Sequence, residues 1–473
     1  MVLWASLFCV LLLLLSSANE ASSYGEKELL SLKRFQWAQP SNKRNCFSRK
    51  SRTQNGATIL EMKHQDHCSG LVRDWSRMLQ KRLSVDDIRV TSLQSRIRKM
   101  VSGKTEALFQ TQIPITSGVK LQTLNYIVMV TLGSRNITVI VDTGSDLTWV
   151  QCQPCKTCYT QPEPLFNPTI SPSYQSVQCN SRACQSLQYA TGNSGLCGNN
   201  PPTCNYLVTY GDGSYTRGEL GQDNLVLGTT SIENFVFGCG RNNKGLFGAA
   251  SGLMGLGRSD LSLISQTSNV FGGVFSYCLP DTDSEASGSL ILGGDSSVYK
   301  NSTPISYTRM APNPQLDSFY ILNLTGTSIG GVSVQAPSFG KGGILIDSGT
   351  VITRLPPSVY RAVKTEFLKQ FSGYPTAPGF SILDTCFNLL AYEEVNIPTV
   401  KMQFEGGAEL NVDITGVFYF VKSDASQVCL ALASLSYEDE IGIIGNYQQR
   451  NTRVIYDTTQ RILGFAKETC SFT

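Results

Sequence analysis

The sequence predicts an all-β fold made of two homologous lobes with a cleft between them. After residue 124 the chain reads as short apolar runs separated by Gly-rich turns, and 42 of its 473 residues are glycine. A five-residue signature occurs twice, at 141–145 (Val-Asp-Thr-Gly-Ser) and at 346–350 (Ile-Asp-Ser-Gly-Thr). The part of the chain after about residue 112, roughly 360 residues, is large for one hydrophobic core, which also favours two lobes.

Residues 1–19 are predicted to be a signal peptide. An apolar run at 2–15 is followed by Ser16, Ser17 and Ala18, and it is too short to cross a membrane comfortably. A buried N-terminal helix is the alternative. We therefore expect a secreted or vacuolar protein. Plastid targeting is the weaker alternative, because the leader starts with a Leu-rich run rather than a Ser- and Arg-rich one.

Residues 20–112 are predicted to be a removable pro-segment, with its boundary within 100–122. Residues 20–106 hold 18 Lys and Arg against 9 Asp and Glu, whereas the rest of the chain holds 21 against 27. Attraction between a basic leader and an acidic body weakens as carboxylates protonate, which predicts activation at acid pH. A helix is expected at 84–100, with Ser84 as its N-cap and apolar residues at helical spacing.

Each copy of the repeated signature places an Asp directly after a β-type run. Two carboxylates held within hydrogen-bond distance share one proton, and their pKa values separate. The charged member can activate a water while the protonated member donates to a carbonyl. Asp142 and Asp347 are therefore the predicted catalytic pair, and two unrelated Asx-turns are the alternative. The residues expected to support them are Thr143, Gly144, Ser145, Ser348, Gly349 and Thr350.

Two further patterns surround these loops. Residues 208–214 read as a β-hairpin with Tyr210 and Gly211 at its turn, and Trp149 follows the first Asp by seven residues. An ordinary hairpin and a core Trp are the competing interpretations. An apolar-apolar-Gly motif then follows each Asp, at 253–255 and at 443–445. Its duplication in the same order supports two homologous lobes, and a peptide would bind in the cleft between them.

Together these motifs resemble the pepsin-like aspartic proteases, from about residue 124 to residue 470. The resemblance implies an endopeptidase that cuts between apolar residues at acid pH. It implies that Ser145 and Thr350 bond the outer carboxylate oxygens, and that Thr143 and Ser348 tie the two loops together. It also implies that Tyr210 and Gly211 belong to a flap over the substrate, with the Trp149 indole bonded to the tyrosine. The lobes would comprise residues 113–300 and 301–473.

Histidine usage excludes several other hydrolase mechanisms. The chain has two His residues, His64 and His67, and both precede the first Asp loop in the expected pro-segment. A body without His cannot form a Ser-His or Cys-His pair or a His-Glu-x-x-His zinc site. No metal and no cofactor is expected.

Twelve of the fifteen Cys residues follow the expected pro-segment, and an even number in a secretory protein indicates disulfides. A metal cluster at 152–158 is the alternative, but no second cluster accompanies it. The Cys-rich insertion resembles the plant nepenthesin-type subgroup. That resemblance implies the following pairs, although the sequence alone leaves the connectivity open: Cys152–Cys155, Cys158–Cys239, Cys179–Cys204, Cys184–Cys197, Cys278–Cys470 and Cys386–Cys429.

Further expectations concern modification and local structure. Asn136, Asn301 and Asn323 begin glycosylation sequons. Asn301 has the most polar neighbours, whereas Asn136 lies close to an expected strand. Strand 124–132 and helices at 259–266 and 357–371 are also predicted.

Two other functions remain open. Relatives that inhibit or sense glycan-degrading enzymes keep this fold but tend to lose a catalytic Asp or the flap Tyr, and all three are present here. The chain also resembles chloroplast nucleoid DNA-binding proteases. DNA binding needs a basic stripe, and the acidic body opposes it. We therefore expect protein or peptide substrates, a monomer, and no DNA binding by the mature form.

Overall fold

The computed structural model describes residues 25–32, 50–64, 75–102, 125–198, 202–210, 214–245, 247, 250–281, 287–299 and 304–472. The expected signal peptide, Gly211 and Asn301 lie outside these described residues. None of the helices within these ranges is long and apolar enough to cross a membrane.

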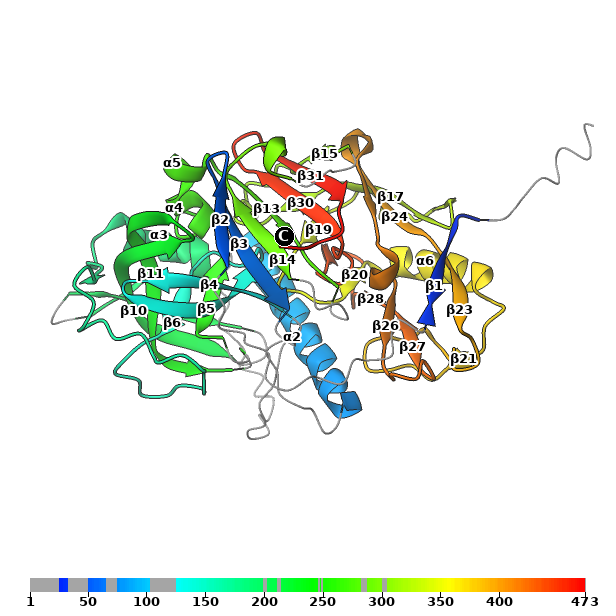
Figure 1. Cartoon of the computed structure of the whole chain (residues 1–473), viewed down its shortest axis with the longest axis horizontal. Coiled ribbons are helices and arrows are strands. Elements are labelled where there is room, and N and C mark those ends of the chain that lie inside the picture. Colours follow the sequence, from blue (N-terminus) through cyan, green and yellow to red (C-terminus); the bar gives the residue numbers. More distant parts are fainter. Residues whose placement is uncertain are drawn as a thin grey trace, which may run out of the picture.

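The all-β, two-lobed architecture is confirmed (Figure 1). The strands of the N-terminal lobe are β4 (Tyr126–Leu132), β5 (Arg135–Asp142), β6 (Trp149–Gln151), β7 (Gln175–Ser176), β8 (Leu196–Cys197), β9 (Cys204–Thr209), β10 (Tyr215–Leu227), β11 (Thr230–Lys244), β12 (Gly252–Gly255), β13 (Val274–Cys278) and β14 (Gly288–Leu292). Its helices are α3 (Arg182–Thr191), α4 (Leu263–Gln266), α5 (Ser268–Phe271) and the 3-10 helix η3 (Ser296–Val298).

The C-terminal lobe is built from shorter strands around helix α6 (Pro357–Gln370). Its strands are β15 (Ser306–Arg309), β16 (Ile321–Leu322), β17 (Leu324–Ile329), β18 (Val332–Val334), β19 (Ile344–Ile346), β20 (Thr353–Leu355), β21 (Thr376–Ala377), β22 (Cys386–Phe387), β23 (Glu394–Pro398), β24 (Val400–Phe404), β25 (Glu409–Asn411), β26 (Phe418–Phe420), β27 (Val428–Leu430), β28 (Leu432–Ser434), β29 (Gly442–Ile444), β30 (Thr452–Asp457) and β31 (Ile462–Lys467). Two 3-10 helices, η4 (Glu405–Gly407) and η5 (Ile414–Gly416), complete the lobe.

One continuous sheet joins the two lobes. With β3 (Ala57–His64) included, its strand order is β15-β31-β30-β13-β14-β3-β4-β5-β12-β6-β11-β10-β9-β8. Strand β13 of the first lobe pairs with β14 on one side and with β30 of the second lobe on the other. Phe275 of β13 stacks on Tyr456 of β30 across the second of these pairings. The C-terminal lobe adds three small sheets. The five-stranded sheet, with the order β16-β19-β29-β20-β28, carries the second Asp loop.

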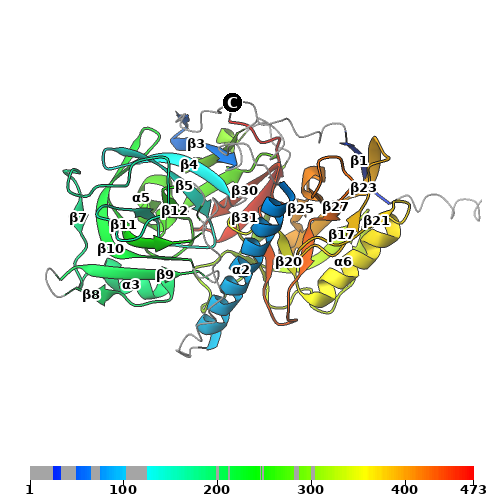
Figure 2. The ribbon, with the colours of Figure 1, turned by 90° about the horizontal axis from the view of Figure 1, so that it is seen from below.

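The described residues of the expected pro-segment are part of this architecture. Strand β1 (Lys27–Ser31) pairs with β23 of the C-terminal lobe, and β2 (Ser51–Gln54) pairs with β3 (Ala57–His64). Strand β3 lies between β14 and β4 in the joint sheet and is almost wholly buried. Helix α2 (Trp75–Ser102) then runs between the two lobes, as Figure 2 shows most clearly.

The expected start of the leader helix was wrong. Helix α2 begins at Trp75, nine residues before Ser84. The Ser84 hydroxyl donates to the carbonyl of Gln80 (2.9 Å), which is the bond a serine makes inside a helix rather than at its cap. The helix expected at 357–371 is confirmed as α6, with Pro357 in its first turn. The helix expected at 259–266 is reduced to α4, because Ser262 caps its N-terminus by accepting from the Ser265 N–H.

Two of the six expected disulfides are present and four are wrong. Cys278–Cys470 and Cys386–Cys429 are bonded as expected. The expected pairs Cys152–Cys155, Cys158–Cys239, Cys179–Cys204 and Cys184–Cys197 are replaced by Cys152–Cys239, Cys155–Cys158, Cys179–Cys197 and Cys184–Cys204.

Tertiary pairing explains these exchanges. Strand β6 runs parallel to β11 with Val150 opposite Cys239, so the Cα atoms of Cys152 and Cys239 lie 5.4 Å apart. Cys155 and Cys158 are left to pair with each other. In the same lobe, the buried face of α3 brings Cys184 onto buried Cys204, which leaves the more exposed Cys179 and Cys197 as the second pair.

Two of the three sequons lie in described residues. Asn136 is exposed on β5, and its side-chain oxygen accepts from the Thr131 hydroxyl (2.8 Å). Asn323 is half-buried, and its amide donates to Glu405 (3.3 Å). Glycosylation at either position stays a prediction.

Candidate active site

The same strand arrangement positions each Asp. Strand β5 ends at Asp142 and pairs in parallel with β12, while β19 ends just before Asp347 and pairs in parallel with β29. These are the duplicated apolar-apolar-Gly strands, and their glycines are required by close backbone contact. A Cβ on Gly255 would lie 2.2 Å from the carbonyl oxygen of Asp146, and one on Gly445 would lie 2.3 Å from that of Val351.

The two carboxylates are bonded in the same way. The Gly144 N–H (3.1 Å) and the Ser145 hydroxyl (2.7 Å) donate to Asp142. The Gly349 N–H (2.9 Å) and the Thr350 hydroxyl (2.6 Å) donate to Asp347. Both Asp side chains are fully buried. Four of the six supporting residues expected from the sequence therefore donate to the carboxylates.

Thr143 and Ser348 connect the loops across the lobe interface. The Thr143 N–H donates to the Ser348 hydroxyl (3.1 Å), and the Ser348 N–H donates to the Thr143 hydroxyl (2.9 Å). A Cβ on Gly144 would lie 2.6 Å from an Asp347 oxygen. Each carboxylate therefore lies against the loop that carries the other, and we call Asp142 and Asp347 the carboxylate pair.

The pKa values of the pair move in opposite directions. Burial raises the pKa of the Asp142 carboxyl, but attraction to the Arg89 guanidinium and the hydrogen bonds to Ser145, Arg89 and Gly144 bring it below its ordinary value of 3.8. Burial also raises the pKa of Asp347, and there the charge of Asp142 adds to it, so this pKa ends above its ordinary value despite Arg89. Such an asymmetric pair favours a single shared proton.

The hairpin expected over the pair is present in its described part. The Tyr210 N–H, just after β9, donates to the carbonyl of Ser214, just before β10 (2.8 Å). The Trp149 indole N–H donates to the Tyr210 hydroxyl (3.0 Å), as the resemblance implies. Phe247 contacts both rings edge-on, with centroids 4.8 and 5.4 Å away.

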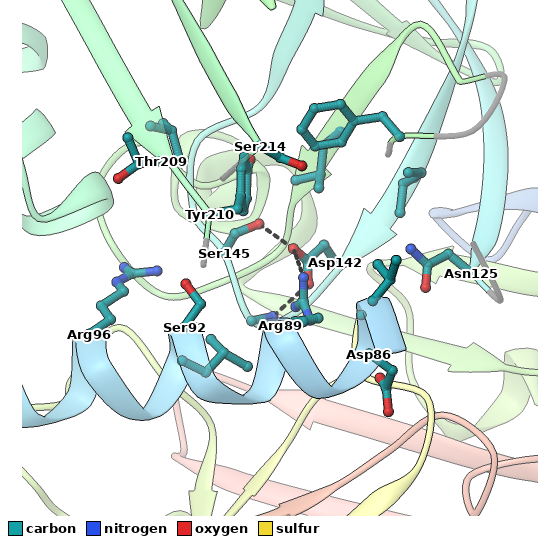
Figure 3. Close-up of a pocket in the computed structure, with 18 of the residues that line it drawn as sticks. Asp86, Arg89, Ser92, Arg96, Asn125, Asp142, Ser145, Thr209, Tyr210 and Ser214 are labelled. Carbon is teal, nitrogen blue, oxygen red and sulfur yellow. Dashed lines mark hydrogen bonds and ion pairs between the residues drawn. The ribbon is translucent and has the colours of Figure 1, made fainter. Parts of the chain in front are cut away.

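Sequence reasoning missed the residue that contacts both carboxylates. Arg89 extends from α2 and donates through Nη2 to Asp142 (2.7 Å) and to Asp347 (2.9 Å), as Figure 3 shows for Asp142. Burial lowers the pKa of its guanidinium, but the two carboxylates outweigh burial and the pKa is raised, so Arg89 stays charged. The sequence placed Arg89 in a basic leader helix, but nothing distinguished it from the other basic residues there.

Helix α2 covers the cleft around Arg89. Its Leu79 and Leu83 pack with residues such as Ile352, and its Val90, Leu93 and Ile97 pack against Phe319 and Ile443. The cavity that remains between α2 and the N-terminal lobe is about 120 Å³. That is well below the roughly 300 Å³ of the smallest typical ligand sites.

A buried polar network beneath the loops was also missed. The Tyr277 hydroxyl bonds Gln449 and lies 2.7 Å from the Tyr456 hydroxyl. The Gln449 amide donates to the backbone carbonyls of Ile444 (2.9 Å) and Asp347 (3.4 Å). The network joins the interlobe strands to the second Asp loop. In the residues that the structure describes, no group of three or more His, Cys, Asp or Glu could hold a metal ion.

The fold and these paired loops define the class of pepsin-like aspartic proteases, and comparison with known proteins agrees. Two family models match the chain, "Xylanase inhibitor N-terminal" at residues 126–294 and "Xylanase inhibitor C-terminal" at residues 319–467. An aspartyl protease family protein of Arabidopsis thaliana is 43% identical over 82% of each chain. Aspartic proteinase nepenthesin-1 of Nepenthes gracilis is 37% identical over 73% of this chain and 78% of its own. The chain therefore belongs to the plant pepsin-like aspartyl protease family.

Solved structures agree on the fold. Basic 7S globulin from soybean superposes with a TM-score of 0.56 at 21% identity, over 74% of this chain and 92% of its own. Conglutin gamma, a basic 7S globulin from lupine seeds, gives the same TM-score at 17% identity, over 72% and 91%. At these identities the likeness shows the fold alone.

Proposed function

We propose that the chain is the precursor of an aspartic endopeptidase that hydrolyses peptide bonds with Asp142 and Asp347. The observation that carries the proposal is the carboxylate pair. It comprises two buried carboxylates with matching hydrogen-bond donors, each lying against the loop that carries the other. This is the arrangement that general acid–base hydrolysis of an amide needs. The aspartyl protease relatives support the same activity.

In the proposed reaction, the space that Arg89 fills is taken by a water and a peptide carbonyl. The ionised member of the pair accepts a proton from the water as its oxygen attacks the carbonyl carbon. The protonated member donates its proton to the carbonyl oxygen, which gives a neutral tetrahedral diol. When the C–N bond breaks, the amine nitrogen takes up a proton from the pair, and one diol hydroxyl returns its proton. The pair then again holds one shared proton.

Leader removal is part of the proposal. The helix α2 blocks the cleft, and Arg89 neutralises the charge of the pair, so the full chain is an inactive zymogen in this scheme. Acid protonates the carboxylates that hold Arg89, which supports activation at low pH. Entry into the secretory pathway, suggested by the N-terminal sequence and by six disulfides among the described residues, fits the same scheme.

The test is cleavage of an unfolded protein between pH 3 and 7 by the wild type and by Asp142→Asn, with the inhibitor pepstatin alongside. We expect acid-optimal activity in the wild type, blocked by pepstatin. Asp142→Asn should lower kcat by about a hundredfold to ten-thousandfold, the usual range for a lost acid–base group. Asp260→Asn is the matched control, because Asp260 is a half-exposed surface residue in the same lobe. A folded, leader-free wild type with no activity would contradict the proposal and favour a binding or inhibitory role.

A further inference from the structure

Helix α2 carries a second charged residue that enters the body of the protein, Asp86. Its carboxylate accepts from the backbone N–H groups of Val351 (2.6 Å) and Ile352 (3.2 Å) and from Nη2 of Arg354 (3.0 Å). In Figure 3 Asp86 points away from Asp142, toward the C-terminal lobe. We call the two N–H groups and the Arg354 guanidinium the carboxylate seat.

The seat is built by the body, not by the leader. The two N–H groups belong to the segment between the second Asp loop and β20, and Arg354 lies within β20. The Arg354 side chain is 1% exposed, and its Nη1 is bonded to the carbonyl of Ile352 (2.8 Å). This bond within the C-terminal lobe orients the guanidinium independently of α2. Three converging donors, one of them charged, are a specific arrangement for a carboxylate.

Departure of α2 would leave this seat empty. Asp86 and Asp87, the two acidic partners of Arg354 among the described residues, both leave with the helix. Arg354 would then lose both of these counter-charges, and the carboxylate of a ligand could replace them. A positive charge fixed at the wall of an opened cleft is a site for a ligand carboxylate.

The position of the seat places it beside a bound peptide. Asp86 precedes Arg89 by three residues, so the two side chains are separated by about 4.5 Å along the helix axis. Val351 follows Asp347 by four residues and lines the same cavity as Asp142. When the scissile bond of a peptide lies over the carboxylate pair, a side chain one or two residues from that bond would reach the seat.

We infer that the seat is a specificity subsite for an acidic side chain, Asp or Glu, near the cleaved bond. Asp86 occupies it in the full chain as an internal mimic of that side chain. The inference rests on the proposed function and adds a class of substrate to it, since an apolar cleft alone would not select acidic residues.

The experiment uses internally quenched peptides that differ only by Glu or Gln at each position from three before to three after the cut. For the leader-free wild type we expect kcat/KM at one position to be about tenfold higher for Glu at pH 6. The ratio should approach one at pH 3, because a Glu side chain with its ordinary pKa near 4.3 is then protonated. A purely structural role of Arg354 would not produce this pH dependence.

Variants assign the preference to the seat. Arg354→Gln should abolish the Glu preference while the Gln peptides are still cleaved, and Arg354→Lys should keep part of it. If Arg354→Gln does not fold, Arg354→Lys and the pH dependence of the wild type still test whether Arg354 causes the Glu preference. Arg361→Gln, an exposed residue on α6, is the matched control and should keep the full preference.

Equal cleavage of Glu and Gln peptides at every position at pH 6 would overturn the inference and leave the peptidase assignment intact. A Glu preference that survives Arg354→Gln would overturn it as well. If leader-free protein cleaves no peptide, the proposed function fails. In that case, fluorescence anisotropy with labelled Glu and Gln peptides measures the affinity for each peptide. Equal affinities would contradict the inference that the seat selects an acidic side chain.

Discussion

At the residue scale, Arg89 couples helix α2, which belongs to the expected pro-segment, to the protonation of the carboxylate pair. Its attraction lowers the pKa of both carboxyls relative to what burial alone would give. Asp347, with its raised pKa, takes up a proton first as the pH falls through its folded pKa, above 3.8. Asp142, with its lowered pKa, keeps its charge until the pH falls below 3.8. As the pH falls, Asp142 therefore keeps its ion pair with Arg89 to a lower pH than Asp347 does.

Replacing Arg89 should consequently move leader release to higher pH. In Arg89→Gln no cation favours the ionised form of the two carboxylates. Helix α2 is then held in the cleft by its apolar contacts and its other polar bonds alone. We expect the pH at which half of the full chain matures in one hour to rise by about one unit, measured on gels between pH 3 and 7.

Arg98→Gln provides the control for this substitution. Arg98 lies on the same helix, but its side chain is 55% exposed, and it forms a longer contact with Glu440 (3.7 Å). Exposed ion pairs contribute little, so its maturation should follow the wild type. An unchanged pH midpoint in Arg89→Gln would show that Arg89 does not hold the leader in place.

At the scale of elements, α2 is attached chiefly to the C-terminal lobe. Its apolar residues enter two clusters of that lobe, one on either side of Arg89. The contacts with the N-terminal lobe are polar, such as Arg96 with Asp146 (3.3 Å) and with the carbonyl of Ala190 (3.1 Å). Burial raises the pKa of Asp146 despite Arg96, so acid also weakens this contact. The helix should therefore separate from the N-terminal lobe before it leaves the other.

Truncating one apolar anchor should accelerate leader release without affecting the released enzyme. Leu83 is fully buried, and Leu83→Ala should weaken docking of the helix by about 2–5 kcal/mol. We expect the half-time of maturation at pH 4.5 to shorten at least tenfold, with kcat/KM of the leader-free product unchanged because Leu83 is no longer present. Val101→Ala, at an exposed position of the same helix, should mature like the wild type. Equal half-times for the two variants would argue against apolar anchoring.

At the scale of the whole molecule, one sheet and one long-range disulfide join the lobes within the described part of the chain. Strand β3 of the leader is inserted between β14 and β4, so the leader contributes to the joint sheet as well as to the cleft. Cys278–Cys470 connects β13 to the C-terminal end across 192 residues. Both features hold the two Asp loops at a fixed separation, which is what the contacts between Thr143 and Ser348 require.

Removing the long-range disulfide should cost far more stability than removing a short one. In the chain-entropy model a loop of this length contributes about 5 kcal/mol, against about 2 kcal/mol for the loop closed by Cys155–Cys158. We expect the Cys278→Ser/Cys470→Ser variant to have a Tm several degrees below that of Cys155→Ser/Cys158→Ser. Calorimetry on the full chains measures both. A smaller loss in the first variant would show that the joint sheet alone fixes the lobes.

The sequence by itself determined the Asp loops, their supporting strands, the Trp149–Tyr210 pair and the helix at Pro357. Each is a local motif whose spacing carries the geometry, so it could be read without knowledge of distant contacts. Only the tertiary structure decided the disulfide partners in the Cys-rich lobe, the choice of Arg89 among many basic residues, and the seat for Asp86. These depend on which strands and faces meet after folding. Arg89 and Asp86 contact residues 53 to 268 positions away, and such contacts leave no local pattern in the sequence.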